Sequence, residues 1–249
     1  MRKFYILATQ CLVVFVFLCL WELVARYEVI RPLYTSSPTQ ISDYIINGFR
    51  DGFLLTHLLA TLNAAFWGLL LGGFLGVVFG IIFALNTTID EIFQPFVSMF
   101  NAMPRLAFAP VIMLWFGFGL SSKVVIVVSM VFFVVFFNIY HGIKEINPIL
   151  LKNSKTLGAT KIQVLKNVYF PAIFGWLFAS LRLSVAYAII SAILGEYIGA
   201  NEGLGFLINN AQAMFNSTAV YGGIVILMVV TLVIDSIIRV LEPKIIKWR

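Results

Sequence analysis

Three ionisable residues lie within or beside long apolar runs of this sequence: Arg182, Glu196 and Asp235. A charge in a hydrocarbon layer is costly and normally faces a cavity or a charged partner. Arg182 precedes Glu196 by fourteen positions, roughly 21 Å along a helix, so these two cannot pair within one chain. Arg182 either faces an aqueous pathway, where it would attract an anionic solute, or is a structural arginine that bonds to carbonyl groups or snorkels to the cytoplasmic side. Glu196 is the second candidate pathway residue, although Glu196 and Asp235 also suit caps or interhelical bonds.

The sequence contains no catalytic or metal-binding motif of a known kind. It has no phosphate-binding loop of the Walker type, no HExxH and no GxSxG. Cys11 and Cys19 are eight positions apart inside one apolar run, a spacing that fits neither a redox motif nor a metal site. We therefore predict no catalytic residue, no metal and no cofactor, and we expect any ATP hydrolysis to come from a partner.

The composition indicates a polytopic membrane protein. Of the 249 residues, 61% are hydrophobic and only 11% are charged, with a mean hydropathy of +0.99, whereas soluble domains carry about 25% charged residues. The apolar runs are continuous, while strands of a membrane barrel would alternate over about ten residues. The predicted fold class is all-α.

Six membrane spans fit the apolar runs of the sequence, because a hydrocarbon core needs about 20 apolar residues of helix. They form one transmembrane domain over residues 1–249. The predicted spans are about 4–25, 58–85, 104–122, 124–143, 172–197 and 219–240.

Basic residues near span ends are retained in the cytoplasm and so indicate orientation. With the N-terminus inside, twelve Lys and Arg residues fall on the inner side, including Arg105, and four on the outer side, including Lys123. This bias predicts that both termini and the polar segment 144–171 are cytoplasmic. The net charge of +6 therefore reflects topology, and the scattered basic residues predict no nucleic-acid partner.

The second span carries small residues at every fourth position. Such rows let helices approach closely in a bilayer. Each four-residue step advances about 40° beyond a full turn, so the row should wind around the helix, and no single neighbour should contact all of it. The row consists of Ala60, Ala64, Gly68, Gly72, Gly76, Gly80 and Ala84.

Segment 144–171 reads as two short helices. Pro148 suits a first helical turn, and Gly158 suits the end of that helix. Ile162, Leu165 and Val168 then share one face of a second helix before Pro171 marks entry to the fifth span. A basic amphipathic segment of this kind either lies on anionic lipid or binds a protein. The residues alone leave both alternatives open.

The spacing Gly158, nine residues, Val168, one residue, Phe170-Pro171 resembles the cytoplasmic loop of binding-protein-dependent ABC importer permeases. That family pattern begins with Glu-Ala-Ala, where this chain has Lys152-Asn153-Ser154. The resemblance implies that the loop forms coupling helices that dock on the ATP-binding subunit. The residues it assigns to this coupling loop are Leu151, Leu157, Gly158, Ala159, Ile162, Leu165, Val168 and Pro171.

Three further segments extend the resemblance to most of the chain. They are MPRLAFAPVIMLWFGFGLSSK (103–123), LGEYIGANEGLGFLI (194–208) and the ending with Asp235, Glu242 and Trp248. In detail they resemble the nitrate, sulfonate and taurine branch of the family, which includes vitamin-precursor systems.

The resemblance implies a permease subunit of the bacterial inner membrane that moves a small polar or anionic organic solute by alternating access. The implied partners are two copies of an ABC ATP-binding subunit, an extracytoplasmic substrate-binding protein and a second, identical permease. Segments 26–56 and 203–218 are candidates for the outer platform of the binding protein or for a lid. The alternative is a gradient-driven secondary transporter, a class that usually shows inverted repeats.

Overall fold

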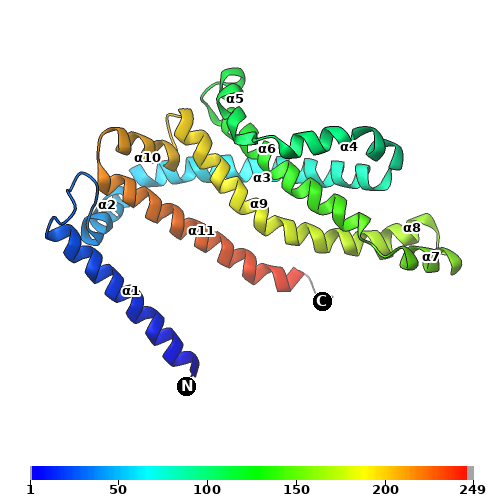
Figure 1. Cartoon of the computed structure of the whole chain (residues 1–249), viewed down its shortest axis with the longest axis horizontal. Coiled ribbons are helices and arrows are strands. Elements are labelled where there is room, and N and C mark those ends of the chain that lie inside the picture. The colour runs from blue at the N-terminus through cyan, green and yellow to red at the C-terminus, as the bar shows by residue number, and fades with distance from the viewer. Residues whose placement is uncertain (1, 246–249) are drawn as a thin grey trace.

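The computed structural model describes residues 2–245, which form helices joined by short turns (Figure 1). The predicted all-α fold is confirmed for this part of the chain; Trp248 lies outside it. The long helices are α1 (Arg2–Arg26), α3 (Phe53–Leu85), α6 (Leu120–Lys144), α9 (Phe170–Gly199) and α11 (Ser217–Ile245). The shorter ones are α2 (Pro38–Arg50), α4 (Thr87–Ala102), α5 (Ala109–Phe116), α7 (Pro148–Thr156), α8 (Lys161–Val164) and α10 (Leu204–Ala213).

Helices α3, α6 and α9 pack together as the centre of the molecule, and four of the short helices lie at its two ends (Figure 1). Helices α7 and α8 lie at one end, and α2 and α10 at the other. Since the loop containing α7 and α8 is the segment predicted to be cytoplasmic, we call the first end the inner end and the second the outer end.

Local capping signals start the helices that precede and follow α3. The Ser37 hydroxyl accepts from the amide of Gln40, and the Gln40 side chain accepts from the amide of Ser37, which starts α2 with a capping box. After α3, the side chain of Asn86 accepts from the amides of Thr88 and Ile89 and starts α4. A helix boundary therefore lies at Asn86, inside an uncharged run that continues to Ile89, and hydropathy does not show it.

The glycine row of α3 faces one helix, α6. Gly68, Gly72, Gly76 and Gly80 are buried against Val127, Val131, Val135 and Ile139. The four glycines of the row therefore share one neighbouring helix, although each four-residue step turns the row around α3. The reason is that α6 presents its own row at four-residue spacing, so the two ridges follow one another along the crossing.

Gly76→Ala is expected to lower the free energy of unfolding by about 1–3 kcal/mol, the usual cost of overpacking. An added Cβ would lie 2.8 Å from the Phe132 carbonyl oxygen, a backbone atom that cannot rotate away. Gly73→Ala is the matched control, because a Cβ there meets nothing within 4 Å. Denaturant unfolding in detergent, followed by tryptophan fluorescence, compares the two. Equal stability losses would contradict the packing assigned to this row.

The third predicted span, 104–122, is not one helix. Helix α4 and the segment Arg105–Phe116, a 3₁₀ turn followed by α5, are bent by 81° at a short break. Five helices are long and apolar enough to cross a membrane, and this bent pair as one span gives the predicted six within residues 2–245.

Proline and glycine explain this difference. Pro104 disfavours helical geometry at Met103, which is extended, and so α4 ends at Ala102. At the other end, Gly117 has φ +77° and Gly119 precedes α6, so a turn interrupts the predicted 104–122 run. The span instead begins seventeen residues earlier, at Thr87.

Lys123 was assigned to an outer loop, but it lies inside α6 with 1% of its surface exposed. Arg105 likewise lies at the break within the bent span and not in an inner loop. Without these two residues the loop bias is eleven basic residues inside against three outside, so the predicted orientation does not depend on them.

Helix α1 stands apart from the other long helices (Figure 1), and none of its apolar window is buried. It is attached near its outer end. There the Trp21 ring packs on Tyr221 at 5.8 Å, and the Glu22 carboxylate accepts from the hydroxyl and amide of Thr39. The rest of α1 therefore offers its apolar surface to lipid or to another chain.

Candidate functional site

Segment 144–171 contains two short helices separated by a glycine. The Asn147 side chain accepts from the amide of Ile149 and caps α7. Gly158 follows α7 with φ +79°, and the Ala159 amide donates to the carbonyl of Ser154, the bond of a Schellman motif. The predicted glycine break is therefore present, and its cause is a left-handed residue at the end of a helix.

A second capping box starts the next helix. The Thr160 hydroxyl accepts from the Gln163 amide, and the Gln163 side chain accepts from the Thr160 amide. This T-x-x-Q signal is readable in the sequence, and it fixes the direction in which α8 leaves the turn.

Pro171 does not mark a helix boundary. Helical structure runs from α8 through a π-turn segment, Leu165–Tyr169, into α9, and the amide of Phe170 donates to the carbonyl of Leu165. Proline lacks an N–H and clashes with the carbonyl four residues earlier. The wider π turn gives the ring room, so the helix continues through the proline.

Several apolar side chains of segment 144–171 are exposed to solvent. Leu157 is 87% exposed, Ile162 75% and Leu165 40%. Ile149 and Leu150 of α7 are also exposed, whereas Leu151, Ala159 and Val168 are half-buried. We call the exposed side chains Ile149, Leu150, Leu157, Ile162 and Leu165 the docking face. A large exposed apolar patch at a polar end of a protein marks an interaction site.

The inner end of α4 is tied to this region. Asp90, in the first turn of α4, accepts from the Tyr140 hydroxyl at 2.7 Å and from the Lys144 ammonium at 2.8 Å. Both partners lie in the last turns of α6, directly before α7. A displacement of segment 144–171 can therefore be passed to the bent span as well as to α6 and α9.

Arg182 has a carboxylate partner. Its guanidinium Nε lies 2.9 Å from Asp235 of α11, and Asp235 also accepts from Arg239 one turn later. The structure thus joins Arg182 to Asp235, a pair that the sequence reading did not make. This ion pair links α9 to α11 through a carboxylate, a partner that neither alternative for Arg182 named.

Glu196 lies at the centre of a buried polar cluster near the outer end of α9. Its Oε2 accepts from the Thr61 hydroxyl at 2.8 Å and from the Gly205 amide at 3.0 Å. Its Oε1 lies 3.9 Å from the Lys123 ammonium. Only 1% of Glu196 is exposed, so in this conformation it contacts protein groups from α3, α6 and α10.

The other members of the cluster hold residues 202–204 against the bundle. Lys123 donates to the Glu202 carbonyl at 2.8 Å, the Gly203 amide donates to Nδ1 of His57 at 3.1 Å, and the Leu204 amide donates to the Thr61 hydroxyl. Gly203 has φ +116°, and a Cβ there would lie about 2.1 Å from the Glu196 carboxyl carbon. The start of α10 is therefore fixed by buried bonds to three spans.

The sequence reading identified Glu196 but not Lys123, Thr61 or His57 as its neighbours. One signal in the sequence could have indicated Lys123, because it lies among apolar residues. If Lys123 is not assigned to a loop, residues 120–144 form one long helix, as they do in the structure. Leu204, Leu207 and Ala211 of α10 are buried. Met214 follows the last helical residue and is 71% exposed.

Comparisons with known proteins agree with this architecture. A family profile described as "Binding-protein-dependent transport system inner membrane component" matches residues 76–247. The chain is 31% identical to the formylaminopyrimidine transport permease protein ThiX of Halalkalibacterium halodurans, covering 100% of this chain and 99% of that protein. It is 27% identical to the taurine transport system permease protein TauC of Escherichia coli, covering 94% and 86% respectively.

A solved structure shares the fold. A chain of the MetNI methionine ABC transporter, crystallised in inward-facing conformations, superposes with a TM-score of 0.63 over 74% of this chain and 94% of that one, at 20% identity. The helical core with its apolar spans, the profile match over two-thirds of the sequence and the full-length relative at 31% identity lead to one assignment. This chain belongs to the family of binding-protein-dependent transport system inner membrane components, as an ABC importer permease.

Proposed function

We propose that the chain is the membrane-spanning half of an ATP-driven importer and that the docking face binds a partner ATP-binding subunit. The observation that carries this proposal is the exposure of Leu157 and Ile162, at 87% and 75%, on a rigidly capped turn. Bulky apolar side chains held in water at a fixed angle are suited to a pocket on a protein. A segment lying on lipid would not need the two capping motifs that fix its geometry.

Movement of the docked ATPases would be passed on along continuous elements. The helix from Ile162 to Gly199 is unbroken, so a displacement of α8 is carried into α9. The contacts of Asp90 with Tyr140 and Lys144 link the same end to α4. We infer that these connections reorient α3, α4–α5, α6, α9 and α11 between inward- and outward-open states, with the Arg182–Asp235 and Glu196–Lys123 contacts holding helices in register.

Two further partners complete the proposal. The outer end, where α2 and α10 lie (Figure 1), provides a platform for an extracytoplasmic binding protein, and its α10 is anchored by the buried Glu196 cluster. A second, identical permease supplies the other half of the pathway, since α1 offers an unburied apolar surface. Both chain termini and the docking face are cytoplasmic in the bacterial plasma membrane.

The solute belongs to the small polar or anionic organic compounds. The relatives are named for different transported solutes, formylaminopyrimidine for ThiX and taurine for TauC. Family membership therefore leaves several chemical classes of solute open. Uptake by this chain is therefore best measured first with the solutes of both relatives.

Reconstitution tests the proposal. The permease is expressed with the ATP-binding and binding-protein genes beside its own, purified as a complex and placed in liposomes. We expect uptake that requires ATP on the docking-face side and persists with an ionophore. Uptake without ATP that an ionophore abolishes would establish a gradient-driven carrier in its place.

Gly158→Pro examines the coupling step in the same liposomes. Proline fixes φ near −65°, whereas Gly158 has φ +79°, so the turn between α7 and α8 cannot keep its shape. We expect ATP-dependent uptake to fall to background while the spans stay folded, because a Cβ added at Gly158 would meet no atom within 4 Å. Intact uptake by this variant would remove the coupling role from the segment.

A further inference from the structure

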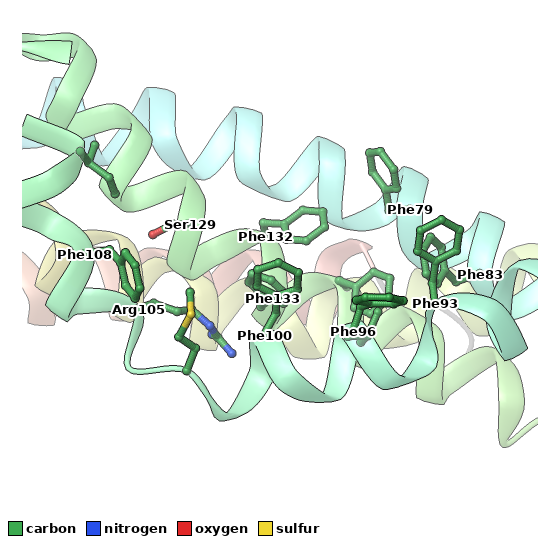
Figure 2. A pocket seen from close by; sticks show the side chains of 14 residues that line it. Phe79, Phe83, Phe93, Phe96, Phe100, Arg105, Phe108, Ser129, Phe132 and Phe133 are labelled. Carbon is green, nitrogen blue, oxygen red and sulfur yellow. The ribbon is translucent and has the colours of Figure 1, made fainter. Parts of the chain in front are cut away.

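A cavity lined mainly by phenylalanine lies between α4, α3 and α6, outside the contacts discussed so far (Figure 2). It has a volume of about 470 Å³, and nine of its fourteen lining residues are phenylalanines. Phe132 is the central residue of α6, so the cavity lies halfway across the membrane-spanning part. Small-molecule sites are typically clefts of roughly 300–1,000 Å³ with a few placed polar groups.

The one charged residue lining the cavity is Arg105, at the break between α4 and α5. Its guanidinium lies 4.3 Å from the centre of the Phe133 ring, and its Nη2 donates to the Asn101 side chain at 2.8 Å. Figure 2 shows Arg105 between Phe108 on one side and Phe100 and Phe133 on the other. The arginine is thus held in place by an aromatic face and an amide.

Arg105 keeps an unused hydrogen-bond donor. Its Nε is buried and has no hydrogen-bond partner among the residues that the structure describes. A buried donor without a partner is unfavourable, and a charged residue at mid-depth in a membrane protein is by default a functional group. An anionic or strongly accepting group inside the cavity would satisfy this donor and the guanidinium charge together.

The remaining wall favours a flat ring. Phe93, Phe96 and Phe100 of α4 face the aromatic side chains of α3 and α6, and neighbouring rings such as Phe83 and Phe93 lie 5.8 Å apart in tilted pairs. Tilted and edge-to-face contacts at these distances are the preferred geometry of aromatic recognition. The α4 rings are 42–54% exposed, so the cavity is open along α4 and a ligand can enter.

We propose that this cavity binds a small planar aromatic or heteroaromatic molecule that carries an anionic or hydrogen-bond-accepting group, with that group on Arg105 and the ring among the phenylalanines. A lipid chain would leave the Arg105 donor unused, and a small anion without a ring would leave the aromatic walls empty. That this molecule is the transported solute rests on the proposed function; the binding itself does not.

Equilibrium dialysis of the full-length permease in nanodiscs tests the site, with naphthalene-2-sulfonate as the probe and empty nanodiscs as the blank. We expect saturable binding of naphthalene-2-sulfonate. Methanesulfonate should not displace it, and naphthalene should bind with lower affinity. Arg105→Gln should weaken binding about tenfold or more, as expected for loss of a charged hydrogen bond. Phe96→Leu should weaken it about threefold or more.

Matched controls separate the cavity from the rest of the surface. Arg50→Gln removes an exposed arginine of α2, and Phe74→Leu removes a ring of α3 that is 67% exposed and does not line the cavity. Both should bind like the wild type. Undiminished binding by Arg105→Gln, equal affinity for naphthalene, or no saturable binding above empty nanodiscs would each overturn the proposal.

The two proposals fail separately. ATP-dependent uptake without saturable probe binding would overturn the aromatic site and leave the importer function standing. Probe binding that depends on Arg105, combined with transport that needs no ATP, would keep the site and overturn the importer function.

Discussion

Glu196→Ala is expected to lower the free energy of unfolding by about 3–5 kcal/mol, because removal of one member of a buried ion pair leaves the other charge uncompensated. The uncompensated charge is Lys123, 1% exposed and 3.9 Å from the Glu196 carboxylate. The Gly205 amide and the Thr61 hydroxyl lose an acceptor at the same time. Unfolding in detergent, followed by tryptophan fluorescence, measures the change.

Two comparisons make this result specific. Glu91→Ala removes an exposed carboxylate of α4 and should change stability by no more than about 0.5 kcal/mol. The double variant Glu196→Ala with Lys123→Met should recover part of the loss, since no unpaired charge remains. If the double variant were as unstable as the sum of the single ones, Lys123 and Glu196 would not be coupled.

Leu157→Asp is expected to weaken association with the ATP-binding subunit by about 30-fold or more, because apolar anchors at the centre of an interface typically contribute at least about 2 kcal/mol. ATP-dependent uptake in liposomes should fall with it. The isolated permease should keep its stability, since the Leu157 side chain is 87% exposed and contributes little to its own fold. Pull-down of the ATPase and uptake are measured on the same preparation.

Leu157→Met is the conservative variant for this experiment. It keeps an apolar side chain of similar size and should bind and transport like the wild type. A loss of uptake in Leu157→Asp with unchanged ATPase binding would place the defect after docking and contradict the role of Leu157 as an anchor. An unfolded Leu157→Asp chain would contradict the exposure on which the docking face rests.

Features carried by nearby residues could be read directly from the sequence. The apolar runs required helices because a backbone in hydrocarbon must satisfy its own hydrogen bonds, and the all-α fold followed. Gly158 lies between two sequence segments that are each compatible with a helix, and the structure confirms the break there. The nearby Thr160–Gln163 capping signal is of the same local kind.

Hydropathy failed where one or two residues changed the course of the chain. The run 104–122 is as apolar as a span, yet the chain bends at its first residue, Pro104, and the glycine turn near 117 interrupts it. Pro171 shows the opposite case, because a π turn absorbs a residue that usually ends a helix. Counting apolar residues cannot detect either event, since both depend on backbone hydrogen bonds.

The sequence by itself determined that the chain is a membrane-spanning helical bundle with a polar loop between two apolar runs and charges inside such runs. Only the tertiary structure decided what those charges contact. Lys123 bonds to Glu202, Arg182 to Asp235, and Arg105 lies at the Phe133 ring. The reason is physical: hydropathy and capping act between residues a few positions apart, whereas the partner of a buried charge comes from another helix, and helix packing alone brings the two together.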